Sequence, residues 1–351
     1  MTSMAASYRV FRVGARPVAA IPDGPRRLRR AAARQCPGGT WRRRAVRAAA
    51  GLGVTLGLDR LFWPRVEQPL AERGLNLGAW LAQARGALGL PESYAVLLWP
   101  PQSWRGRVYL RLLDSGGRLR AFVKVALDPY NEGRLVNERR ALACLRGAET
   151  GQVRFPRVLA EGRWAGQYSL AMEPFPKGGR PPGRGEASAG AGCATAWAGE
   201  RRRLTEAELR GADWWRGWER EPAGCGGFRR EVARAAAAGL ETCRVHGDLA
   251  PGNILRIDGR YWVYDWEGFD ERGPWLTDRL SYWLGERQRF ALRRPDRAAA
   301  ALARRFLGEE RRSRADVAAG LAFLCAARSL AARAVADRWG GGDAEGGEAR
   351  G

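Results

Sequence analysis

The chain has 351 residues, and 45% of them are hydrophobic, which is enough to bury a core in two domains or in two lobes of one catalytic unit. A net charge of +23 would ordinarily indicate nucleic acid or an anionic membrane as the partner. However, only Lys124 and Lys177 are lysines, and Ala, Gly and Arg are abundant everywhere, as in the product of a GC-rich genome. Because no basic run is interleaved with aromatic residues, we expect no nucleic-acid partner.

The cysteine pattern and the lack of long apolar segments bear on where the protein works. The cysteines form no C-x-x-C pair and have no histidine partner for a zinc site; they are Cys36, Cys144, Cys193, Cys225, Cys243 and Cys325. Residues 1–30 contain no continuous apolar core of signal-peptide type, and no stretch approaches 18 uncharged apolar residues. We therefore expect reduced thiols in a cytoplasmic protein that is soluble, or peripheral at the inner face of the membrane.

Residues 1–90 are interpreted as a basic N-terminal extension. The stretches PRRLRRAAARQ and WRRRAVRAAAGLGVTLGLDRLFW predict basic, partly amphipathic helices on either side of a Pro-Gly-Gly break at 37–39. A region that contacts anionic lipid through residues 1–63 would have this composition. So would a helix that packs on the main domain with a solvated arginine face, and this second interpretation is favoured.

Residues 91–175 are predicted to form a small, mostly antiparallel N-lobe. The expected elements are strands at YAVLLW, RVYLRLLD and RLRAFVKVA, a helix at NEGRLVNERRALACLR, and a further strand at QYSLAMEPF. Residues 115–117 would form the short loop between the second and third strands.

Residues 176–338 are predicted to form a mainly helical C-lobe, and residues 339–351 a disordered tail. A low-complexity loop covers 176–200. Helices are expected at about 203–219, 227–241, 275–290, 296–307 and 313–338. The expected fold class is therefore α+β with two lobes. No sequence feature indicates the oligomeric state.

A tight hairpin is predicted where NILRI is followed by Asp258-Gly259 and RYWVYDW. Asp-Gly supplies the positive φ angles that a type I′ turn needs. Pairing residue 257 with residue 260 brings Asn253 opposite Tyr264, so Asn253 and Asp265 meet at the open end of the hairpin. Asp248, five residues before Asn253, lies on the loop that leads into it.

Two oxygen-bearing side chains at a hairpin mouth suit Mg²⁺, which is usually held by one or two carboxylates together with phosphates and water. A nearby carboxylate that binds no metal could accept a hydroxyl proton. The alternative is that Asp248 and Asn253 only satisfy backbone turns, as these residue types often do.

At these residues the chain resembles the aminoglycoside phosphotransferase and choline kinase branch of the protein-kinase-like superfamily. The matching positions are His246-Gly247-Asp248, Asn253 at the fifth position after that aspartate, and Asp265-Trp266-Glu267 twelve residues further on. The branch has Gly where eukaryotic protein kinases have Arg in the catalytic loop, and Asp-x-Glu where they have Asp-Phe-Gly. This sequence follows the branch at both places, and the resemblance covers about residues 94–290.

The resemblance implies a bilobal protein-kinase-like fold, ATP and Mg²⁺ as cofactors, and phosphate transfer to a hydroxyl group. Asp248 would orient and deprotonate the acceptor hydroxyl, while Asn253 and Asp265 would hold Mg²⁺ on the ATP phosphates. His246 would brace the loop against the metal-binding segment. Two further residues would assist: Glu267, at the metal or phosphate, and Asp278, which supports the catalytic loop.

The kinase interpretation requires a cation for the phosphates on the third strand of the N-lobe, and Lys124 in AFVKVA fits. A buried ammonium needs a counter-charge. On the following helix Glu138 shares one face with three leucines, which makes it the expected partner, with Glu132 as the fallback. The alternative is that Lys124 reaches the surface and Glu138 lies at the edge of the apolar stripe.

Two further segments would complete a nucleotide site. Backbone groups near Glu173 and Phe175, in AMEPF, would meet the adenine edge. The loop PPQSWRGR at 100–107 occupies the place of the phosphate lid of protein kinases, although only Gly106 is glycine.

The acceptor is expected to be a hydroxyl of a small molecule, such as a sugar or a glycan precursor. Trp faces stack on sugar rings and Arg binds carboxylate or phosphate, although Trp residues at helical spacing also form cores. The residues concerned are Trp197, Trp214, Trp215 and Trp218. The alternative function is a catalytically silent kinase-like module that binds nucleotide or a partner.

Overall fold

The computed structural model describes residues 7–36, 41–99, 106–176, 178–182, 193, 196–220 and 226–339. They divide into two compact units. The sheet unit comprises residues up to 139 together with 156–176, and the helical unit comprises 140–155 and the residues from 177 on. Most of the expected phosphate lid, most of the loop at 176–200, and the tail from 340 lie outside the described residues.

The sheet unit contains one large antiparallel sheet. Its strands are β1 (Tyr8–Val13), β2 (Arg16–Pro22), β3 (Arg65–Val66), β4 (Tyr94–Leu98), β5 (Arg107–Leu113), β6 (Leu119–Ala126), β8 (Val158–Trp164) and β9 (Gln167–Met172). Its helices are α1 (Arg26–Ala33), α2 (Trp41–Thr55), α3 (Leu58–Phe62), the 3₁₀ turn η1 (Ala71–Arg73), α4 (Leu77–Leu88) and α5 (Pro129–Cys144), which continues into the helical unit.

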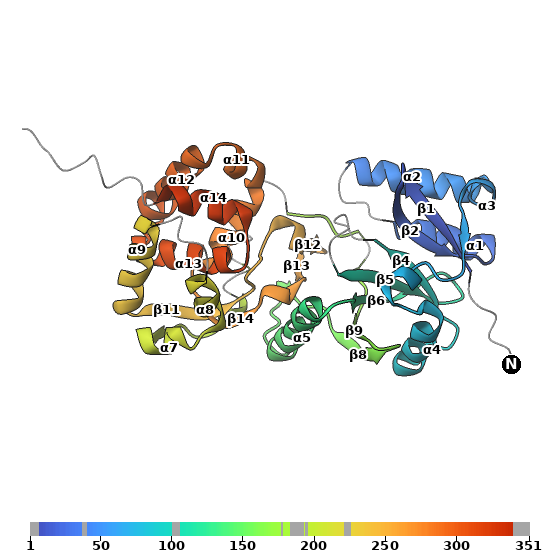
Figure 1. Ribbon diagram of the computed structural model, residues 1–351, viewed down its shortest axis with the longest axis horizontal. Coiled ribbons are helices and arrows are strands. Elements are labelled where there is room, and N and C mark those ends of the chain that lie inside the picture. Colours follow the sequence, from blue (N-terminus) through green and yellow to red (C-terminus); the bar gives the residue numbers. More distant parts are fainter. Residues whose placement is uncertain are drawn as a thin grey trace, which may run out of the picture. The chain divides into compact units, whose positions relative to one another are not determined.

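The strand order is β3-β1-β2-β4-β5-β6-β9-β8, and every neighbouring pair is antiparallel. Both faces of this sheet are covered, as the alternation along β4 shows. Val96 and Leu98 point into a core with α1 and α2, whereas Ala95 and Leu97 point into a second core with Trp80 of α4. Figure 1 shows α2 over β1 and β2, and α4 next to β8.

The strands and the helix predicted between 94 and 175 are confirmed, and so are helices in both basic stretches of residues 1–90. Four strands were not predicted: β1, β2 and β3, which join the sheet beyond β4, and β8. Leu98 of β4 pairs with Ala19 of β2 across almost eighty residues of chain. Such a long-range pairing leaves no local signal in an arginine-rich stretch.

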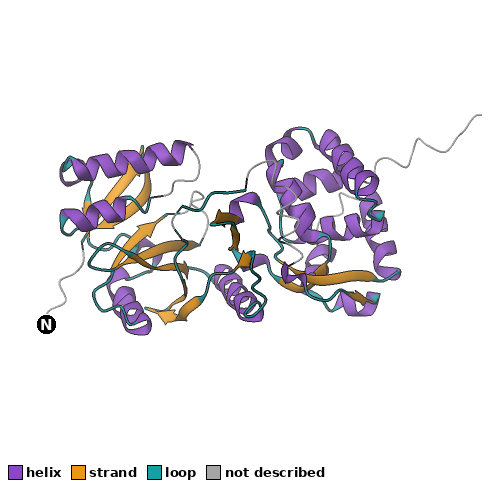
Figure 2. Cartoon of the chain, turned by 180° about the vertical axis from the view of Figure 1, so that it is seen from behind, coloured by secondary structure: helices purple, strands orange, loops and turns teal. Residues whose placement is uncertain are grey.

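The helical unit is built mainly from helices around one apolar core. Its helices are α7 (Glu206–Arg210), α8 (Asp213–Glu219), α9 (Gly226–Ala237), α10 (Thr277–Glu286), α11 (Gln288–Arg293), α12 (Pro295–Ala303), the π-helical turn η5 (Arg304–Glu309), α13 (Arg314–Ala326) and α14 (Leu330–Trp339). Figure 2 shows these helices in purple, with small sheets beside them.

Two three-stranded sheets and two 3₁₀ turns carry the motif residues of the helical unit. They are formed by β7 (Val153–Arg154), β10 (Arg202–Leu204), β11 (Leu240–Val245), η3 (Pro251–Asn253), β12 (Ile254–Ile257), β13 (Arg260–Val263), η4 (Trp266–Gly268) and β14 (Asp270–Pro274). The sheet orders are β10-β11-β14 and β12-β13-β7. The chain is thus of the α+β class, with an antiparallel sheet in one unit and mainly helices in the other, as expected.

Several predicted helices have different limits from those expected. The segment 203–219 begins as β10 and breaks into α7 and α8, and 227–241 ends at Ala237, before β11. The segment 313–338 is two helices, separated near Arg328, which has φ +63°. Among the described residues, no helix has the length and hydropathy that a bilayer crossing requires.

Candidate functional site

The hairpin that presents the metal-binding candidates has the predicted register. Ile257 pairs with Arg260, and the backbone amide of Tyr264 donates to the carbonyl of Asn253 at 3.1 Å. Asp258 and Gly259 have φ of +49° and +77°, as a type I′ turn requires. Asn253 and residue 265 therefore meet at the open end of the β12–β13 hairpin.

The loop before this hairpin is held by a buried carboxylate on α10. Asp278 Oδ2 accepts from the amide of His246 at 2.8 Å, and its Oδ1 accepts from the amide of Gly247 at 3.0 Å. The indole Nε1 of Trp197 donates to Oδ2 at 3.1 Å. Burial raises the pKa of Asp278. The electrostatic interaction with the His246 ring and the hydrogen bonds from these three donors lower it. The carboxylate therefore sets the path of residues 246–247.

The single histidine connects the loop to the strand that precedes Asp265. His246 is fully buried, and its Nε2 lies 3.0 Å from the carbonyl oxygen of Tyr264. Its Nδ1 accepts from the amide of Asp248 at 3.3 Å. This pair of contacts requires the Nε2–H tautomer, in which Nε2 donates. The imidazole also packs on Trp266, with ring centroids 4.5 Å apart.

Gly247 stands where the loop touches the backbone after the hairpin. Its φ is +80°, and a Cβ at this position would lie 2.1 Å from the carbonyl oxygen of Gly268. Neither the backbone angle nor the space admits a side chain there. This close approach gives a structural reason for glycine at the second position of His-Gly-Asp.

The loop and the hairpin mouth bring the candidate oxygen ligands near one another. The side-chain Nδ2 of Asn253 donates to the backbone carbonyl of Asp248 at 2.8 Å. Carboxylate oxygens of Asp265 and Glu267 lie within 4.8 Å of each other. Asp248 is exposed, whereas Glu267 is buried. Carboxylate and amide oxygens are ligands that suit Mg²⁺, so the residue types present fit this ion.

Asp265 has an unusual backbone conformation. Its φ of +70° and ψ of +52° lie in the left-handed region, which aspartate and asparagine tolerate better than most residues. A non-glycine residue in the left-handed region raises the free energy of the folded protein, and such residues concentrate at functional sites. The carbonyl of the preceding Tyr264 is the one that His246 contacts.

In the sheet unit, Lys124 of β6 and Glu138 of α5 form the expected ion pair. Lys124 Nζ lies 2.8 Å from Glu138 Oε2 and 3.0 Å from Oε1. Lys124 is only 4% exposed and Glu138 is fully buried, so each charge stabilises the other. The fallback partner, Glu132, pairs instead with Arg163.

The segment expected to meet adenine is partly committed to other contacts. The amide of Glu173 donates to the carbonyl of Arg157 at 2.9 Å, and its carboxylate pairs with the Arg157 guanidinium at 2.9 Å. The ring of Phe175 packs on Phe122 of β6, with centroids 5.6 Å apart. Of the two polar backbone groups of Glu173, only the carbonyl remains a candidate for the adenine edge.

Two tryptophans that support the loop were not predicted to do so. Trp197 donates to Asp278 and makes edge contacts with Trp266 at 5.2 Å, and both rings also contact Phe155. For Trp266, its place between Asp265 and Glu267 was the sequence feature that could have indicated a supporting role. Trp197 lies in a low-complexity stretch, and no sequence feature indicated that it contacts Asp278.

The other tryptophans proposed for acceptor stacking belong to the core. Trp214, Trp215 and Trp218 are each at most 6% exposed and lie in the main apolar cluster of the helical unit. Trp218 packs edge-on against Phe228 at 5.3 Å. Their spacing is therefore that of a buried helix face, and no acceptor contact is assigned to them.

One cavity lies at the turn of the hairpin, away from its open end. It has a volume of about 330 Å³ and is lined by Gly178, Arg180, Arg256, Ile257, Asp258 and Gly259. The backbones of Arg180 and Arg256 form a two-residue bridge beside it. None of the predicted site residues lines this cavity.

No family model and no curated protein sequence matches the chain. Among solved structures it is similar to an aminoglycoside 3′-phosphotransferase of type VIII, with 20% identity, a TM-score of 0.42, and coverage of 74% of this chain and 96% of that one. It is also similar to an aminoglycoside phosphotransferase from Streptomyces rimosus, with 16% identity, a TM-score of 0.41, and coverage of 76% and 100%. A third similar structure is a Thermobifida fusca protein named as a fructosamine-3-kinase, with 21% identity, a TM-score of 0.41, and coverage of 73% of this chain and 97% of that one.

Proposed function

We propose that the protein is an ATP- and Mg²⁺-dependent phosphotransferase that moves the γ-phosphate to a hydroxyl group of a small molecule. The observation that carries this proposal is the way Asp278 and His246 hold one loop and one hairpin together. Through them the exposed carboxylate of Asp248 and the oxygen groups of Asn253 and Asp265 gather in one region of the helical unit. A loop serving only as a turn could use Asp248 and Asn253 for backbone contacts, but it would not require the two carboxylates of Asp265 and Glu267 at the hairpin mouth.

Each residue has a distinct proposed role. Asp248 would orient the acceptor hydroxyl and take its proton, because it is exposed and lies beside the proposed metal ligands rather than among them. Asn253 and Asp265 would hold the metal ion, and Glu267 would assist them. Bound Mg²⁺ would neutralise charge on the phosphates during transfer.

In the sheet unit, Lys124 is proposed to bind the α- and β-phosphates. Its ion pair with Glu138 fixes the ammonium group and keeps it charged in a buried position. The adenine edge would be met near Glu173 and Phe175. The phosphate contact is supported by the geometry of the Lys124–Glu138 pair. The adenine contact is supported by the position of residues 173–175 directly after β9.

The acceptor is proposed to be neutral or anionic, such as a sugar or a glycan precursor. A polycationic acceptor would need an acidic pocket, and no segment of the sequence concentrates acidic residues for one. Phosphate transfer to aminoglycosides that is faster than transfer to neutral sugars would contradict this part of the proposal.

The metal and nucleotide site can be tested by thermal unfolding with and without Mg-ATP. A ligand that binds only the folded protein stabilises it by about 2.7 kcal/mol at a hundredfold excess over Kd. We expect a clear upward shift in Tm for the wild type and a much smaller shift for Asp265→Asn. Asparagine tolerates the left-handed backbone, so this variant removes the charge and keeps the fold.

A matched control exists on the same hairpin. Asp258 also has a positive φ, of +49°, but lies at the turn, so Asp258→Asn makes the same chemical change away from the proposed site. It should retain the full Mg-ATP shift. Equal losses in both variants, or no shift in a folded wild-type protein, would contradict the proposed site.

Catalysis is tested separately by following ADP release and phosphate transfer to a panel of hydroxyl compounds. Asp248→Asn should keep the Mg-ATP shift and lose transfer by about a hundredfold or more. A wild-type protein that binds Mg-ATP and transfers phosphate to no acceptor would favour the alternative, a kinase-like module without catalytic activity.

A further inference from the structure

The outer surface of α2 and α3 exposes a group of large apolar side chains. Their exposed fractions are 59% for Leu52, 61% for Leu56, 38% for Leu58, 77% for Leu61 and 74% for Phe62. We call these five residues the α2–α3 patch. Single exposed leucines are common on proteins, but five within eleven residues form a local concentration that marks an interaction surface.

From Ala48 to Thr55, after its arginines, the helix α2 is apolar on both of its sides. Ala50 and Val54 point into the core against β2 and β4. The opposite side carries Leu52 and Leu56, one turn apart, and the exposed alanines Ala45, Ala48 and Ala49 precede them. A helical stretch that is apolar on opposite sides is normally covered on both of them. Here only the inner side is covered by the sheet unit.

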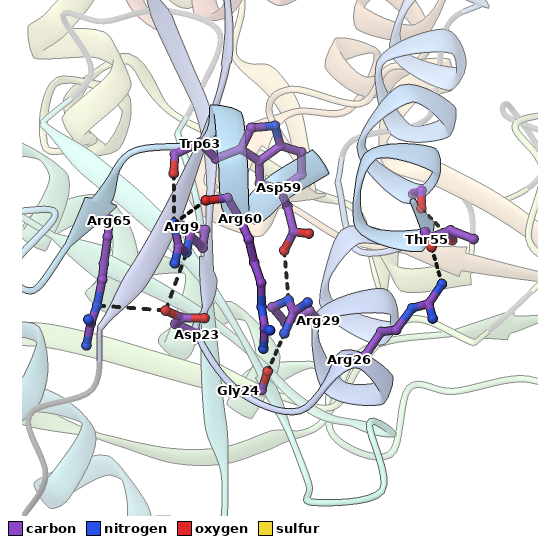
Figure 3. Close-up of polar contacts among 11 residues, drawn as sticks. Arg9, Asp23, Gly24, Arg26, Arg29, Thr55, Asp59, Arg60, Trp63 and Arg65 are labelled. Carbon is purple, nitrogen blue, oxygen red and sulfur yellow. Dashed lines mark hydrogen bonds and ion pairs between the residues drawn. The ribbon is translucent and has the colours of Figure 1, made fainter. Parts of the chain in front are cut away.

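Polar contacts fix α3 and the strand after it to the rest of the unit, as Figure 3 shows. Arg29 of α1 pairs with Asp59 of α3 at 2.7 Å, and both side chains are buried. Arg9 of β1 donates to the carbonyls of Arg60 and Trp63 at 3.2 and 3.3 Å. The patch is therefore carried by a well-anchored part of the fold.

The segment that carries the patch, residues 26–66, is strongly basic. Residues 26–66 contain eleven arginines and a single acidic residue, Asp59, which is buried and paired with Arg29. The exposed arginines among the described residues of this segment are Arg26, Arg27, Arg30, Arg34, Arg47, Arg60 and Arg65. No exposed carboxylate in the described part of this segment offsets them. Although Arg65 pairs with Asp23, this surface combines exposed leucine and phenylalanine with an excess of positive charge.

We propose that the α2–α3 patch docks on the surface of an anionic lipid bilayer. Leu61 and Phe62 would enter the boundary between headgroups and acyl chains, while Arg47 and Arg60 would meet lipid phosphates. A second copy of the chain is a poorer occupant because it would bring the same positive surface against this one. This inference is independent of the proposed phosphotransferase activity.

The test is co-flotation of the full-length protein with vesicles. Wild-type protein should float with vesicles of phosphatidylglycerol and phosphatidylcholine, and about tenfold less with phosphatidylcholine alone. The double variant Leu61→Ser/Phe62→Ser should lose binding by about a hundredfold, because these two largely exposed side chains are the ones proposed to enter the lipid. Arg47→Gln/Arg60→Gln should lose about tenfold or more, and added salt should weaken wild-type binding.

The matched control is Leu292→Ser/Leu330→Ser, which removes two exposed leucines, 45% and 63% accessible, from the helical unit. It should bind like the wild type, and the Tm of all variants should be unchanged. Absence of co-flotation with anionic vesicles overturns the proposal, as does full binding by Leu61→Ser/Phe62→Ser. A wild-type dimer that this variant converts to a monomer, without lipid binding, would also overturn it and assign the patch to self-association.

Discussion

The carboxylate of Asp278 accepts a hydrogen bond from the backbone amide of His246 at 2.8 Å, although 32 residues separate them in the chain. The same carboxylate holds the next amide, that of Gly247, and the indole of Trp197. One buried side chain of α10 thus orders the loop that carries Asp248. His246 connects this loop to the hairpin, because its Nε2 contacts the carbonyl oxygen of Tyr264. The histidine therefore connects two backbone segments.

Asp278→Ala is expected to destabilise the protein by about 3 kcal/mol or more, because it leaves buried donors without an acceptor, each at about 1–3 kcal/mol. Urea unfolding would measure this loss. Asp296→Ala is the control: Asp296 also lies in the first turn of a helix but is largely exposed, so its loss should be about 0.5 kcal/mol. Similar losses in the two variants would show that Asp278 does not hold the loop.

Replacing Gly247 by Ala should be far more costly than replacing Gly259. Both glycines have φ near +80°, so both variants carry the left-handed penalty of about 1–2 kcal/mol. At Gly259 a Cβ meets nothing within 4 Å, whereas at Gly247 it would overlap the carbonyl of Gly268. Denaturant midpoints of the two variants give the difference directly. Equal midpoints would mean that the loop can move away from residue 268 without cost.

The Lys124–Glu138 pair should show strong coupling in a double-mutant cycle. Lys124→Met and Glu138→Leu, made singly, each leave one buried charge without its partner, at about 3–5 kcal/mol. Together they replace the pair by apolar groups and should recover most of that loss. The double variant should be folded and show no Tm shift with Mg-ATP. Additive losses would mean that the two charges do not depend on each other.

The buried cysteines should resist alkylation in the folded protein. Burial raises the pKa of Cys36 to about 11 and those of Cys193 and Cys243 to about 12, so almost no reactive thiolate exists at pH 8. Cys144 is half-buried and should react first among the described cysteines. Mass spectrometry after iodoacetamide treatment would compare these peptides. Urea should make all of them react, and rapid labelling of Cys243 without urea would contradict its burial.

The local features of the proposed site could be predicted from the sequence because they depend on short stretches of chain. Asp258-Gly259 between two alternating segments determines the turn and with it the register that places Asn253 opposite Tyr264. Likewise, the position of Glu138 on the apolar side of its helix, after a strand that buries Lys124, was enough to predict their ion pair.

Only the tertiary structure decided which distant segments support these features. The contact of Trp197 with Asp278 spans 81 residues, and the pairing of β2 with β4 brings residues 16–22 into the sheet. Neither has a local signal, because the partner of a buried indole or of a strand added from a distant part of the chain is decided by the surface that it meets. For the same reason, helical spacing did not distinguish core tryptophans from ligand-stacking ones. It also did not show that α2 buries one apolar side and exposes the other.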